Sequence, residues 1–446
     1  MPSRVRKKVL SVGVSDSSGG TGVQGDIKTF SGMGVHGTTV ITGITAQNTR
    51  GVQAVHPLPA IFIRQQMDSI FDDLSPSATK TGLLLTGKIV QQVARRLRGT
   101  EAPLVVDPVL TGTYGVELSG PDAVEALRRY LIPQADVVTP NLHEASALVG
   151  WDVRDLDGMI KAARQIHELG CKAVLVTGGH LSHPQAIDVL YDGKLVKLRG
   201  DRIEVDLLGT GAALSAVITS LLAKGQRTRD ACKMAKEVVS QYMRQGYDIG
   251  EGKDVVDTFA TLYSEAEKYR VLQDLRAGLR RLERLLTPAL VPRMGSNMGY
   301  GLSHVNGADE VCALVGRLLM TGPHVRAVGT PDFGGHDPIA STVAVAHSYD
   351  HRFRCALRIS YDANVVLAAK ALNLQVGRFD YEDMPEGTED PEGWGVATAI
   401  EDLGGIVPDL VIDDGGHGHE AGIRLLGSSP KEVAGKLRMV LGEMAA

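Results

Sequence analysis

Asp206-Leu-Leu-Gly-Thr-Gly-Ala-Ala-Leu-Ser-Ala216 is the stretch that decides the fold. The apolar run 203–208 predicts a strand, and the run after Gly209-Thr210-Gly211 predicts a helix to about Lys224. Glycines at a strand-to-helix turn let the backbone approach an anion closely. The start of the helix adds unpaired N–H groups and a positive dipole end. The turn is therefore predicted to hold a phosphoryl group during its transfer.

The same turn is unusual at the position that follows it. Phosphoryl transfer commonly uses a side chain that takes the proton from the attacking hydroxyl. The first helical position, where such a side chain is expected, holds Ala212. We therefore predict a catalytic turn made of Gly209, Thr210, Gly211 and Ala212 that lacks its base.

Composition excludes several classes of protein. The chain has 446 residues, 43% of them hydrophobic and 22% charged, which predicts a globular protein of two domains. A net charge of −5 argues against nucleic acid or an anionic membrane as a partner. The four cysteines are widely spaced, which argues against a disulfide framework or zinc knuckle and favours a reducing cytoplasm. No segment reaches membrane-spanning length.

Residues 1–258 alternate short apolar runs with helical patterns. The runs 9–14, 104–106, 136–138 and 173–176 predict buried parallel strands, and 186–205 predicts a hairpin at the sheet edge. This pattern predicts an open α/β sheet that binds ligands beyond the carboxyl ends of its strands.

Residues 259–287 predict one amphipathic helix, in which leucines recur at three- and four-residue steps. We expect a connector helix packed between domains, with a coiled-coil dimer as the alternative. Pro288 and Pro292 end it. Residues 288–446 then form the second, smaller α/β domain, which shows fewer regular patterns.

Candidate ligand-binding side chains follow several of the predicted strands. Small residues between Ser15 and Asp26 suit a flat ligand, although capping of a helix explains them equally well. Gln47 carries a carboxamide, whose donor and acceptor match the edge of an aminopyrimidine. Asn141 and Glu144 lie on one side of a first helical turn, where they suit water-mediated Mg²⁺ or, alternatively, only the helix dipole.

Together these motifs resemble the hydroxymethylpyrimidine and hydroxymethylpyrimidine-phosphate kinases of thiamine biosynthesis, in the ribokinase-like superfamily. The resemblance covers about residues 8–258 and rests on S-D-x-S-G-G-x-G-x-Q-x-D-I-K-T-F, T-A-Q-N-T, V-D-P-V, T-P-N-x-x-E-A, V-x-G-G-H and G-T-G. It implies a three-layer sandwich around a mostly parallel sheet, and ATP with Mg²⁺ as cofactors.

The resemblance also assigns roles to individual residues. It implies that the pyrimidine is recognised by Gln47 and enclosed by Thr21, Asp26, Leu83 and Val109. It implies that Mg²⁺ is ordered by Asn141 and Glu144, and that the nucleotide is contacted by Thr177, Gly178 and Gly179. The anion hole would be formed by residues 209–211. The family usually reads T-H-G-T-G-C, so this chain departs from it at Leu207, Leu208 and Ala212.

Residues 288–446 resemble the archaeal-type thiamine phosphate synthase domain found fused to this kinase. Arg317 matches the family's basic residue, and Asp413 and Glu420 lie in the matching glycine-rich loop, so these three are expected to hold phosphate. Where the family has a histidine and then an arginine, this chain has Pro338 and Ser341, with His336 nearby.

Two hypotheses follow from the sequence. The first is a bifunctional enzyme that phosphorylates hydroxymethylpyrimidine phosphate and joins the resulting diphosphate to thiazole phosphate. The alternative is a catalytically reduced paralogue that binds pyrimidine or thiamine phosphates as a sensor or partner. Under both hypotheses we expect a cytoplasmic homo-oligomer, a dimer, with small-molecule ligands and no nucleic acid or membrane partner.

Overall fold

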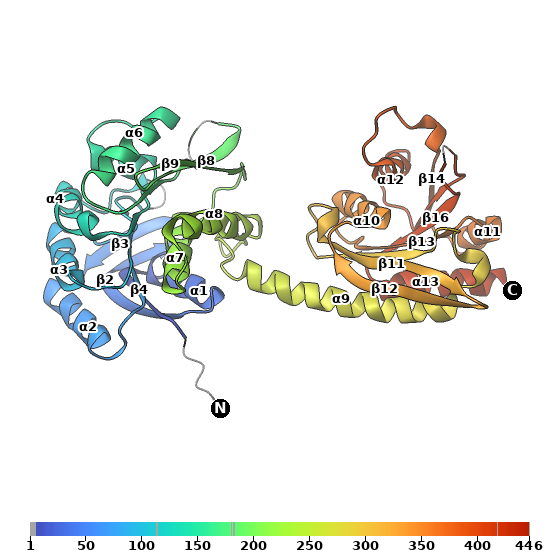
Figure 1. Cartoon of the computed structure of the whole chain (residues 1–446), viewed down its shortest axis with the longest axis horizontal. Coiled ribbons are helices and arrows are strands. Elements are labelled where there is room, and N and C mark those ends of the chain that lie inside the picture. The colour runs from blue at the N-terminus through green and yellow to red at the C-terminus, as the bar shows by residue number, and fades with distance from the viewer. Residues whose placement is uncertain (1–5, 113–114, 180, 182, 417, 446) are drawn as a thin grey trace. The chain divides into compact units, whose positions relative to one another are not determined.

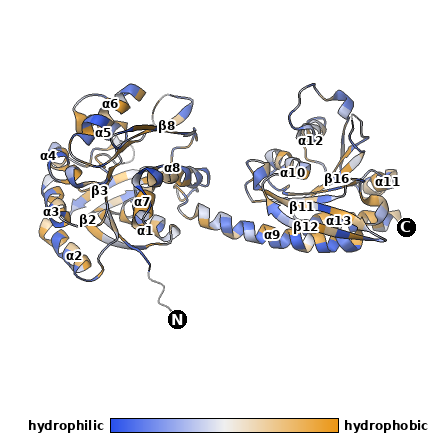
Figure 2. Cartoon of the chain, viewed as in Figure 1, coloured by the Kyte–Doolittle hydropathy of each residue, from blue (hydrophilic) through white to orange (hydrophobic). Residues whose placement is uncertain are grey.

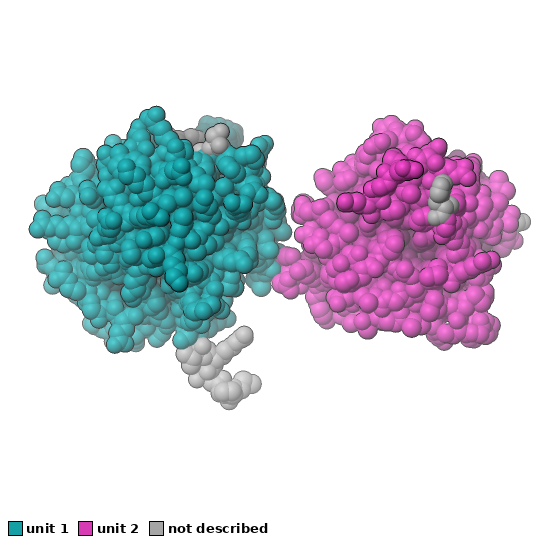
Figure 3. All heavy atoms as spheres, turned by 45° about the horizontal axis from the view of Figure 1, so that its top comes forward, with its two compact units in different colours: residues 1–263 teal, residues 264–446 magenta. Residues whose placement is uncertain are grey.

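A computed structural model describes residues 6–112, 115–179, 181, 183–416 and 418–445. The chain divides into two compact units, residues 1–263 and residues 264–446, which Figure 3 shows in two colours. Each unit is built around one sheet, and each is described by itself.

The first unit, drawn from blue to green in Figure 1, contains a nine-stranded sheet in the order β3-β2-β1-β4-β5-β6-β7-β8-β9. Six neighbouring strands of this sheet run parallel: β2, β1, β4, β5, β6 and β7. Antiparallel strands form both edges, β3 on one side and β8 with β9 on the other. The expected fold, a mostly parallel α/β sheet, is confirmed. The elements are β1 (Lys8–Asp16), α1 (Gly22–Gly32), β2 (His36–Asn48), β3 (Gly51–Pro57), α2 (Ala60–Asp73), β4 (Ala78–Thr81), α3 (Gly87–Leu97), β5 (Leu104–Val106), α4 (Pro121–Ala126), β6 (Val137–Val138), α5 (Leu142–Val149), α6 (Leu156–His167), β7 (Val174–Val176), β8 (Gln185–Tyr191), β9 (Leu195–Asp201), α7 (Thr210–Ala223) and α8 (Thr228–Arg244).

Alternation of side chains along the central strands produces the three layers. Val105 and Val137 pack on one face of the sheet, in the same core as α7 and α8. Their neighbours Val106 and Val138 pack on the opposite face, in the core formed with α2, α3, α5 and α6. Because both faces are covered, β5, β6 and β7 are apolar at every position, which is the pattern that predicts parallel strands.

Two local predictions in this unit are wrong. Residues 203–208 form no strand, and only Leu208 makes an isolated bridge, to Val255. Gln47 does not follow the second strand but lies within β2, next to a register shift against β3. The predicted edge hairpin is confirmed as β8 and β9.

The second unit contains a seven-stranded sheet in the order β12-β11-β10-β13-β16-β15-β14. Ile412 and Leu425 pack on the face that α11, α13 and the long helix α9 cover. Val411 and Leu426 pack on the other face, under α10 and α12. The elements are α9 (Ala260–Leu285), β10 (Asn297–Gly301), β11 (Val311–Thr321), β12 (His324–Phe333), α10 (Pro338–Tyr349), β13 (Cys355–Ser360), α11 (Ala363–Ala371), β14 (Val376–Phe379), α12 (Pro391–Glu401), β15 (Leu410–Asp413), β16 (Gly422–Gly427) and α13 (Pro430–Met444).

The predicted amphipathic helix is present as α9, and Figure 2 shows hydrophilic and hydrophobic residues interspersed along it. Val271, Leu275, Leu279 and Leu282 of this helix, and Leu286 directly after it, are buried in the core of the second unit. Residues before them, such as Tyr269, are exposed. The apolar stripe is therefore used within the second unit. The domain boundaries after residues 258 and 287 stay predictions.

Two further observations concern the environment of the protein. Among the described residues, no helix is both long and apolar enough to cross a membrane. The four cysteines are buried free thiols, so the sequence-based expectation of no disulfide framework agrees with the described structure.

Candidate active site and a second cavity

A cavity of about 770 Å³ opens at the carboxyl ends of the parallel strands in the first unit. Its walls come from segments far apart in the sequence, including the residues directly after β4, β5, β6 and β7. The predicted site residues that line it are Thr21, Asp26, Gln47, Leu83, Val109, Asn141, Glu144, Thr177, Gly179, Gly209, Thr210, Gly211 and Ala212. Such a location is where open α/β sheets bind ligands.

Gly178 is the one predicted site residue of the first unit that does not line this cavity. Its N–H donates to Asp188 Oδ1 at 3.0 Å, and a Cβ on it would lie 2.0 Å from the carbonyl oxygen of Ile187. Gly178 is therefore required for the close approach of β7 and β8. His180, the last residue of the glycine motif, lies outside the described residues.

The glycine turn leaves the start of α7 available to an anion. Gly209 is the N-cap with φ +90°, and a Cβ there would lie 2.3 Å from the carbonyl oxygen of Gly20. No side chain caps the helix, so its first N–H groups are not taken by a capping group. Nothing approaches the Cβ direction of Gly211. Ala212 is the third helical residue and not the first, because α7 already begins at Thr210.

Asp16, at the end of β1, contacts two residues of the cavity wall. Its carboxylate accepts hydrogen bonds from the N–H and hydroxyl of Thr21, at 2.8 and 2.7 Å. Gln47 Nε2 also donates to it, at 3.4 Å. Asp16 thus holds the predicted substrate residues Thr21 and Gln47 side by side. Leu83 and Val109 add apolar walls to the same cavity.

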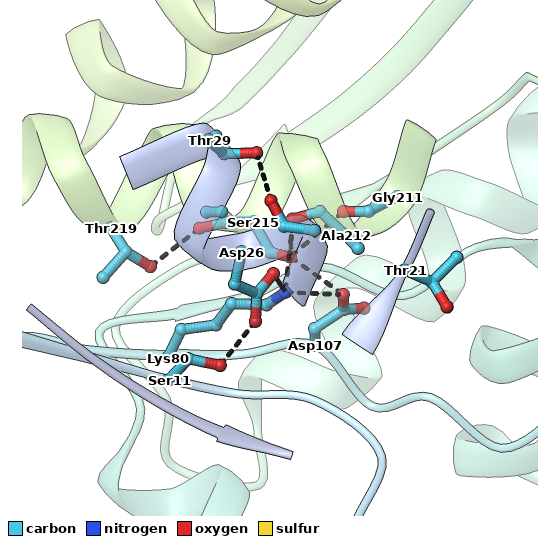
Figure 4. A network of polar contacts seen from close by, with 12 residues as sticks. Ser11, Thr21, Asp26, Thr29, Lys80, Asp107, Gly211, Ala212, Ser215 and Thr219 are labelled. Carbon is cyan, nitrogen blue, oxygen red and sulfur yellow. Dashed lines mark hydrogen bonds and ion pairs between the residues drawn. The ribbon is translucent and has the colours of Figure 1, made fainter. Parts of the chain in front are cut away.

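Asp26 has a different environment from the one predicted. Its side chain is buried, one oxygen accepts from Ser11 Oγ at 2.5 Å, and the other pairs with Lys80 Nζ. Both oxygens are engaged by the protein, so Asp26 reaches the ligand only through these partners. The buried Lys80 also donates to the carbonyl oxygen of Ala212 at 3.2 Å and lies 3.9 Å from Asp107 (Figure 4).

Sequence reasoning assigned no role to Lys80, Asp107 or Ser215, which the structure brings together next to the carbonyl oxygen of Ala212. Ser215 Oγ donates to Asp107 Oδ2 at 2.8 Å. Burial raises the pKa of Asp107 to about 6, against the opposing effects of Lys80 and Ser215. A signal was present in the sequence: Lys80 is the only charged residue of a short buried strand, and a buried lysine requires a partner.

Asn141 and Glu144 form a capping box at the start of α5. Asn141 Oδ1 accepts from the Glu144 N–H, and Glu144 Oε2 accepts from the Asn141 N–H, both at 2.9 Å. Burial and the nearby Asp107 raise the pKa of Glu144 well above its usual value. A cation would relieve this crowding of carboxylates. No cluster of three or more metal-binding side chains exists among the described residues, so phosphate and water oxygens would have to complete the shell of a Mg²⁺ ion.

The second unit contains a smaller cavity of about 330 Å³, lined by His336, Pro338, Ser341, Arg358 and His419 among others. Arg358 donates from Nη2 to the carbonyl oxygen of Glu420 at 3.1 Å, and its buried Nε has no partner among the described residues. His419 stacks on Tyr381, with ring centroids 4.1 Å apart. The cavity therefore offers a cation and an aromatic surface.

The three predicted phosphate residues of the second unit do not line this cavity. Arg317 pairs with Asp337, and the fully buried Asp413 pairs with Arg424. Glu420 accepts from the N–H of Arg293 at 3.0 Å. All three are engaged by partners within the protein, whereas Pro338 and Ser341 do line the cavity. His417 lies outside the described residues.

Comparisons with known proteins match the two units to two different families. The phosphomethylpyrimidine kinase family model matches residues 16–257, and the thiamine-phosphate synthase ThiN family model matches residues 274–439. A hydroxymethylpyrimidine/phosphomethylpyrimidine kinase of Streptomyces coelicolor is 41% identical over 56% of this chain and 93% of its own length. The chloroplastic bifunctional thiamine enzyme TH1 of Arabidopsis thaliana is 41% identical over 57% of this chain and 50% of its own length.

Solved structures give the same picture for the first unit. The ADP complex of Bacillus subtilis pyridoxal kinase matches 58% of this chain and 99% of its own, with TM-score 0.54 and 36% identity. Staphylococcus aureus pyridoxal kinase in complex with AMP-PCP and pyridoxal matches 57% and 95%, with TM-score 0.53 and 32% identity. The ribokinase-like expectation for the fold is confirmed.

Proposed function

Because the chain belongs to the phosphomethylpyrimidine kinase family, we propose that its first unit moves the γ-phosphoryl group of ATP onto the hydroxymethyl group of hydroxymethylpyrimidine or its phosphate. The protein is an enzyme of thiamine biosynthesis with a kinase domain and a ThiN thiamine-phosphate synthase domain. Residues 1–258 would be the kinase, residues 259–287 the connector and residues 288–446 the synthase-like domain.

One observation carries the proposal for the kinase. Residues from separate segments, chosen from sequence motifs, line one cavity beside the uncapped start of α7. In this proposal Gln47 reads the pyrimidine, Thr21, Leu83 and Val109 enclose it, and the N–H groups of residues 209–212 hold the transferring phosphoryl group. Thr177 and Gly179 contact the nucleotide. Asp26 acts on the site through its ion pair with Lys80.

Mg²⁺ belongs to the proposal as well. Asn141, Glu144 and Asp107 supply oxygen donors to the cavity, which suits a hard cation held partly by phosphate and water. When bound, the ion would neutralise charge on the phosphates. Asn141 and Glu144 keep their capping box while they orient the water molecules of the ion.

For the second unit we propose a phosphate-binding domain with reduced synthase activity. Arg358 offers a buried Nε that has no partner among the described residues. Arg317 is close to the cavity because it pairs with Asp337, a residue of the cavity wall. Asp413 and Glu420 shape the loop that carries His419. Pro338 and Ser341 occupy the positions expected to give cationic help to the leaving diphosphate. In this proposal Arg358 is sufficient to bind the phosphate of a ligand, whereas the transition state of thiamine phosphate synthesis is only weakly stabilised.

A cytoplasmic homodimer with small-molecule ligands completes the proposal. The four buried thiols support a reducing compartment. Sedimentation of the full chain tests the dimer directly.

Replacing Ala212 by cysteine is expected to raise kinase turnover by about tenfold or more, because a thiolate at the start of a helix accepts a proton that a methyl group cannot. The measurement is ADP release with hydroxymethylpyrimidine phosphate and ATP. Ala212→Ser serves as the matched control of similar volume. Rapid wild-type turnover that Ala212→Cys leaves unchanged would show that residue 212 is not the position of the base.

If wild type releases no ADP yet binds hydroxymethylpyrimidine phosphate in calorimetry, the catalytically reduced paralogue is the better description. That outcome is distinct from a protein that binds neither pyrimidine nor nucleotide. The latter result would remove the proposed kinase function altogether.

Thiamine phosphate is expected to raise the melting temperature of the second unit, since Arg358 gains a charge-assisted hydrogen bond. In a Trp151→Phe background the fluorescence of Trp394 reports on this unit alone, because the chain has two tryptophans. Arg358→Met should abolish the shift, and the exposed Arg352→Met should preserve it. Efficient thiamine phosphate formation by wild type would contradict the proposed loss of synthase activity.

A further inference from the structure

Lys80 lines the cavity of the first unit, and the contacts with substrate proposed above do not account for its charge. The residue is 2% exposed, and a charge buried this deeply is costly unless the protein compensates it. One partner is Asp26, whose other oxygen accepts from Ser11 Oγ. A buried ion pair is often no more stable than an apolar pair of similar volume. Stability therefore does not explain why this position holds a lysine.

The ammonium group of Lys80 also contacts the catalytic turn. Nζ donates to the carbonyl oxygen of Ala212 at 3.2 Å, and Figure 4 shows this contact beside the pair with Asp26. Asp107 lies 3.9 Å from Nζ, beyond hydrogen-bonding distance. Of the three N–H donors of Lys80, one is thus used by Asp26 and one by the backbone of α7. A hydrogen bond from a charged donor is stronger than one from a neutral donor.

A chain of peptide groups leads from this contact to the anion hole. The Ala212 carbonyl shares its peptide group with the N–H of Ala213, which donates to the carbonyl oxygen of Gly209 at 2.8 Å. The Gly209 carbonyl shares its own peptide group with the N–H of Thr210, the first residue of α7. Thr210 lines the cavity, and no acceptor for its N–H is found among the described residues. The ammonium group and this N–H are therefore the two ends of one hydrogen-bonded chain.

Such a chain affects an anion hole in two ways. Each hydrogen bond polarises the next peptide group, so the charge of Lys80 makes the N–H of Thr210 a stronger donor. The contact also fixes the third residue of α7, so that the N–H groups of the first turn are oriented before the phosphoryl group arrives. A restraint from outside the turn is useful here, because the glycines at 209 and 211 allow the backbone many conformations.

We propose that Lys80 is a positioning residue of the anion hole, which holds and polarises the first turn of α7 through the carbonyl group of Ala212. The proposal rests on the kinase function proposed above, and it concerns the transferring phosphoryl group and not the pyrimidine. Lys80 itself contacts neither. Asp26 then has a defined task, because it balances the charge of Lys80 without using the N–H that reaches Ala212.

The test is the full-length double variant Lys80→Met and Asp26→Asn, which removes the cation and its counter-charge together. Asparagine still accepts from Ser11, and the net charge of the protein does not change. We expect kcat for ADP release to fall about tenfold, while KM for hydroxymethylpyrimidine phosphate stays within about threefold. Loss of a whole anion-hole donor costs about 100- to 1,000-fold, and a contact two peptide groups away should cost less. The matched control, Lys172→Met and Asp136→Asn, breaks an ion pair outside the cavity and should leave kcat unaltered.

A second readout follows the anion hole without turnover. In protein with isotope-labelled threonine, the amide NMR signal of Thr210, assigned with Thr210→Ser, should shift on titration with inorganic phosphate. In the Lys80→Met and Asp26→Asn variant the midpoint of this titration should rise about threefold or more, because the N–H of Thr210 is a weaker donor. A merely structural ion pair would not change this midpoint in a folded protein.

Three results would overturn the proposal. The first is a folded variant whose kcat stays within about threefold of wild type, and the second is an unchanged midpoint for Thr210. The third is a fall in kcat with an equal loss of pyrimidine binding, since that pattern indicates general damage to the cavity.

Failure of the kinase function gives a different result. A wild type that binds both substrates without turnover would remove that function, and the phosphate titration of Thr210 would still decide the role of Lys80. No shift of Thr210 in wild type would overturn both.

An apolar version of the cluster covers the case in which the double variant does not fold. Lys80→Met, Asp26→Leu and Ser11→Ala together remove the polar partners at once, so that no buried group is left unpaired by the change. We expect the same fall in kcat and the same rise of the Thr210 midpoint. Wild-type values of both in this folded triple variant would equally overturn the role of Lys80.

Discussion

A fragment that begins at residue 288 is expected to remain unfolded, whereas a fragment that begins at residue 264 is expected to fold. The shorter fragment lacks α9 and the residue that follows it, which together contribute five buried apolar side chains to the core of the second unit: Val271, Leu275, Leu279, Leu282 and Leu286. At about 1.5–3 kcal/mol for each side chain, their loss removes on the order of 10 kcal/mol. That loss is comparable to the whole stability of a typical domain, about 5–15 kcal/mol.

Polar contacts of α9 add to this expectation. Glu267 pairs with Arg354 at 2.8 Å, and Glu283 accepts the N–H of Ala327 in β12 at 2.9 Å. At Gly278 a Cβ would lie 2.6 Å from Pro430, so α9 and the start of α13 are in close contact. The helix is therefore an integral part of the second unit.

Amide NMR spectra of the two fragments check this prediction. The 264–446 fragment should show dispersed signals and the 288–446 fragment should not. Leu275→Asp in the longer fragment should also abolish the dispersion, and the matched change Tyr269→Asp, at an exposed position of the same helix, should preserve it. Dispersed signals from the shorter fragment would contradict the role assigned to α9.

Replacing Arg424 by methionine is expected to destabilise the second unit by about 3–5 kcal/mol, because it leaves two buried carboxylates without their cation. Arg424 is fully buried in β16 and pairs with Glu392 at 2.7 Å and with Asp413. Burial alone would raise the pKa of Glu392, but the charge and hydrogen bonds of Arg424 outweigh it and lower the pKa to about 2. The stability gained from Glu392 is present above about pH 4.5 and is lost as the pH falls toward 2.

Urea unfolding followed by Trp394 fluorescence, in the Trp151→Phe background, measures the effect. Arg352→Met is the matched control, since Arg352 forms an exposed pair with Asp350 and its loss should leave the free energy of unfolding almost unchanged. Adding Glu392→Gln and Asp413→Asn to Arg424→Met should recover much of the loss. Equal effects of Arg424→Met and Arg352→Met would show that burial of the ion pairs does not matter.

Local sequence motifs predicted the wall of the cavity in the first unit but not the partners of the charged residues in the second unit. The motifs around Gln47, Asn141 and Gly209 identified wall residues of one cavity: Gln47 lies near the end of β2, Asn141 follows β6, and Gly209 lies directly before α7. Asp413 and Glu420 were expected at a ligand, yet Arg424 and Arg293 engage them. A loop sequence gives the type of a charged residue but not the partner that the rest of the chain supplies.

By itself, the sequence determined the parallel sheet of the first unit, since continuous apolar runs indicate strands covered on both faces. It also determined the helix α9, since a period of three to four residues indicates one buried face. It also showed that the turn predicted to be catalytic is followed by an alanine at position 212. Only the tertiary structure decided that α9 packs into the second unit and that Lys80, Asp107 and Ser215 meet beneath the turn. Lys80 contacts the Ala212 carbonyl across 132 positions of the chain, and no local pattern records a contact that forms only when separate strands and helices pack together.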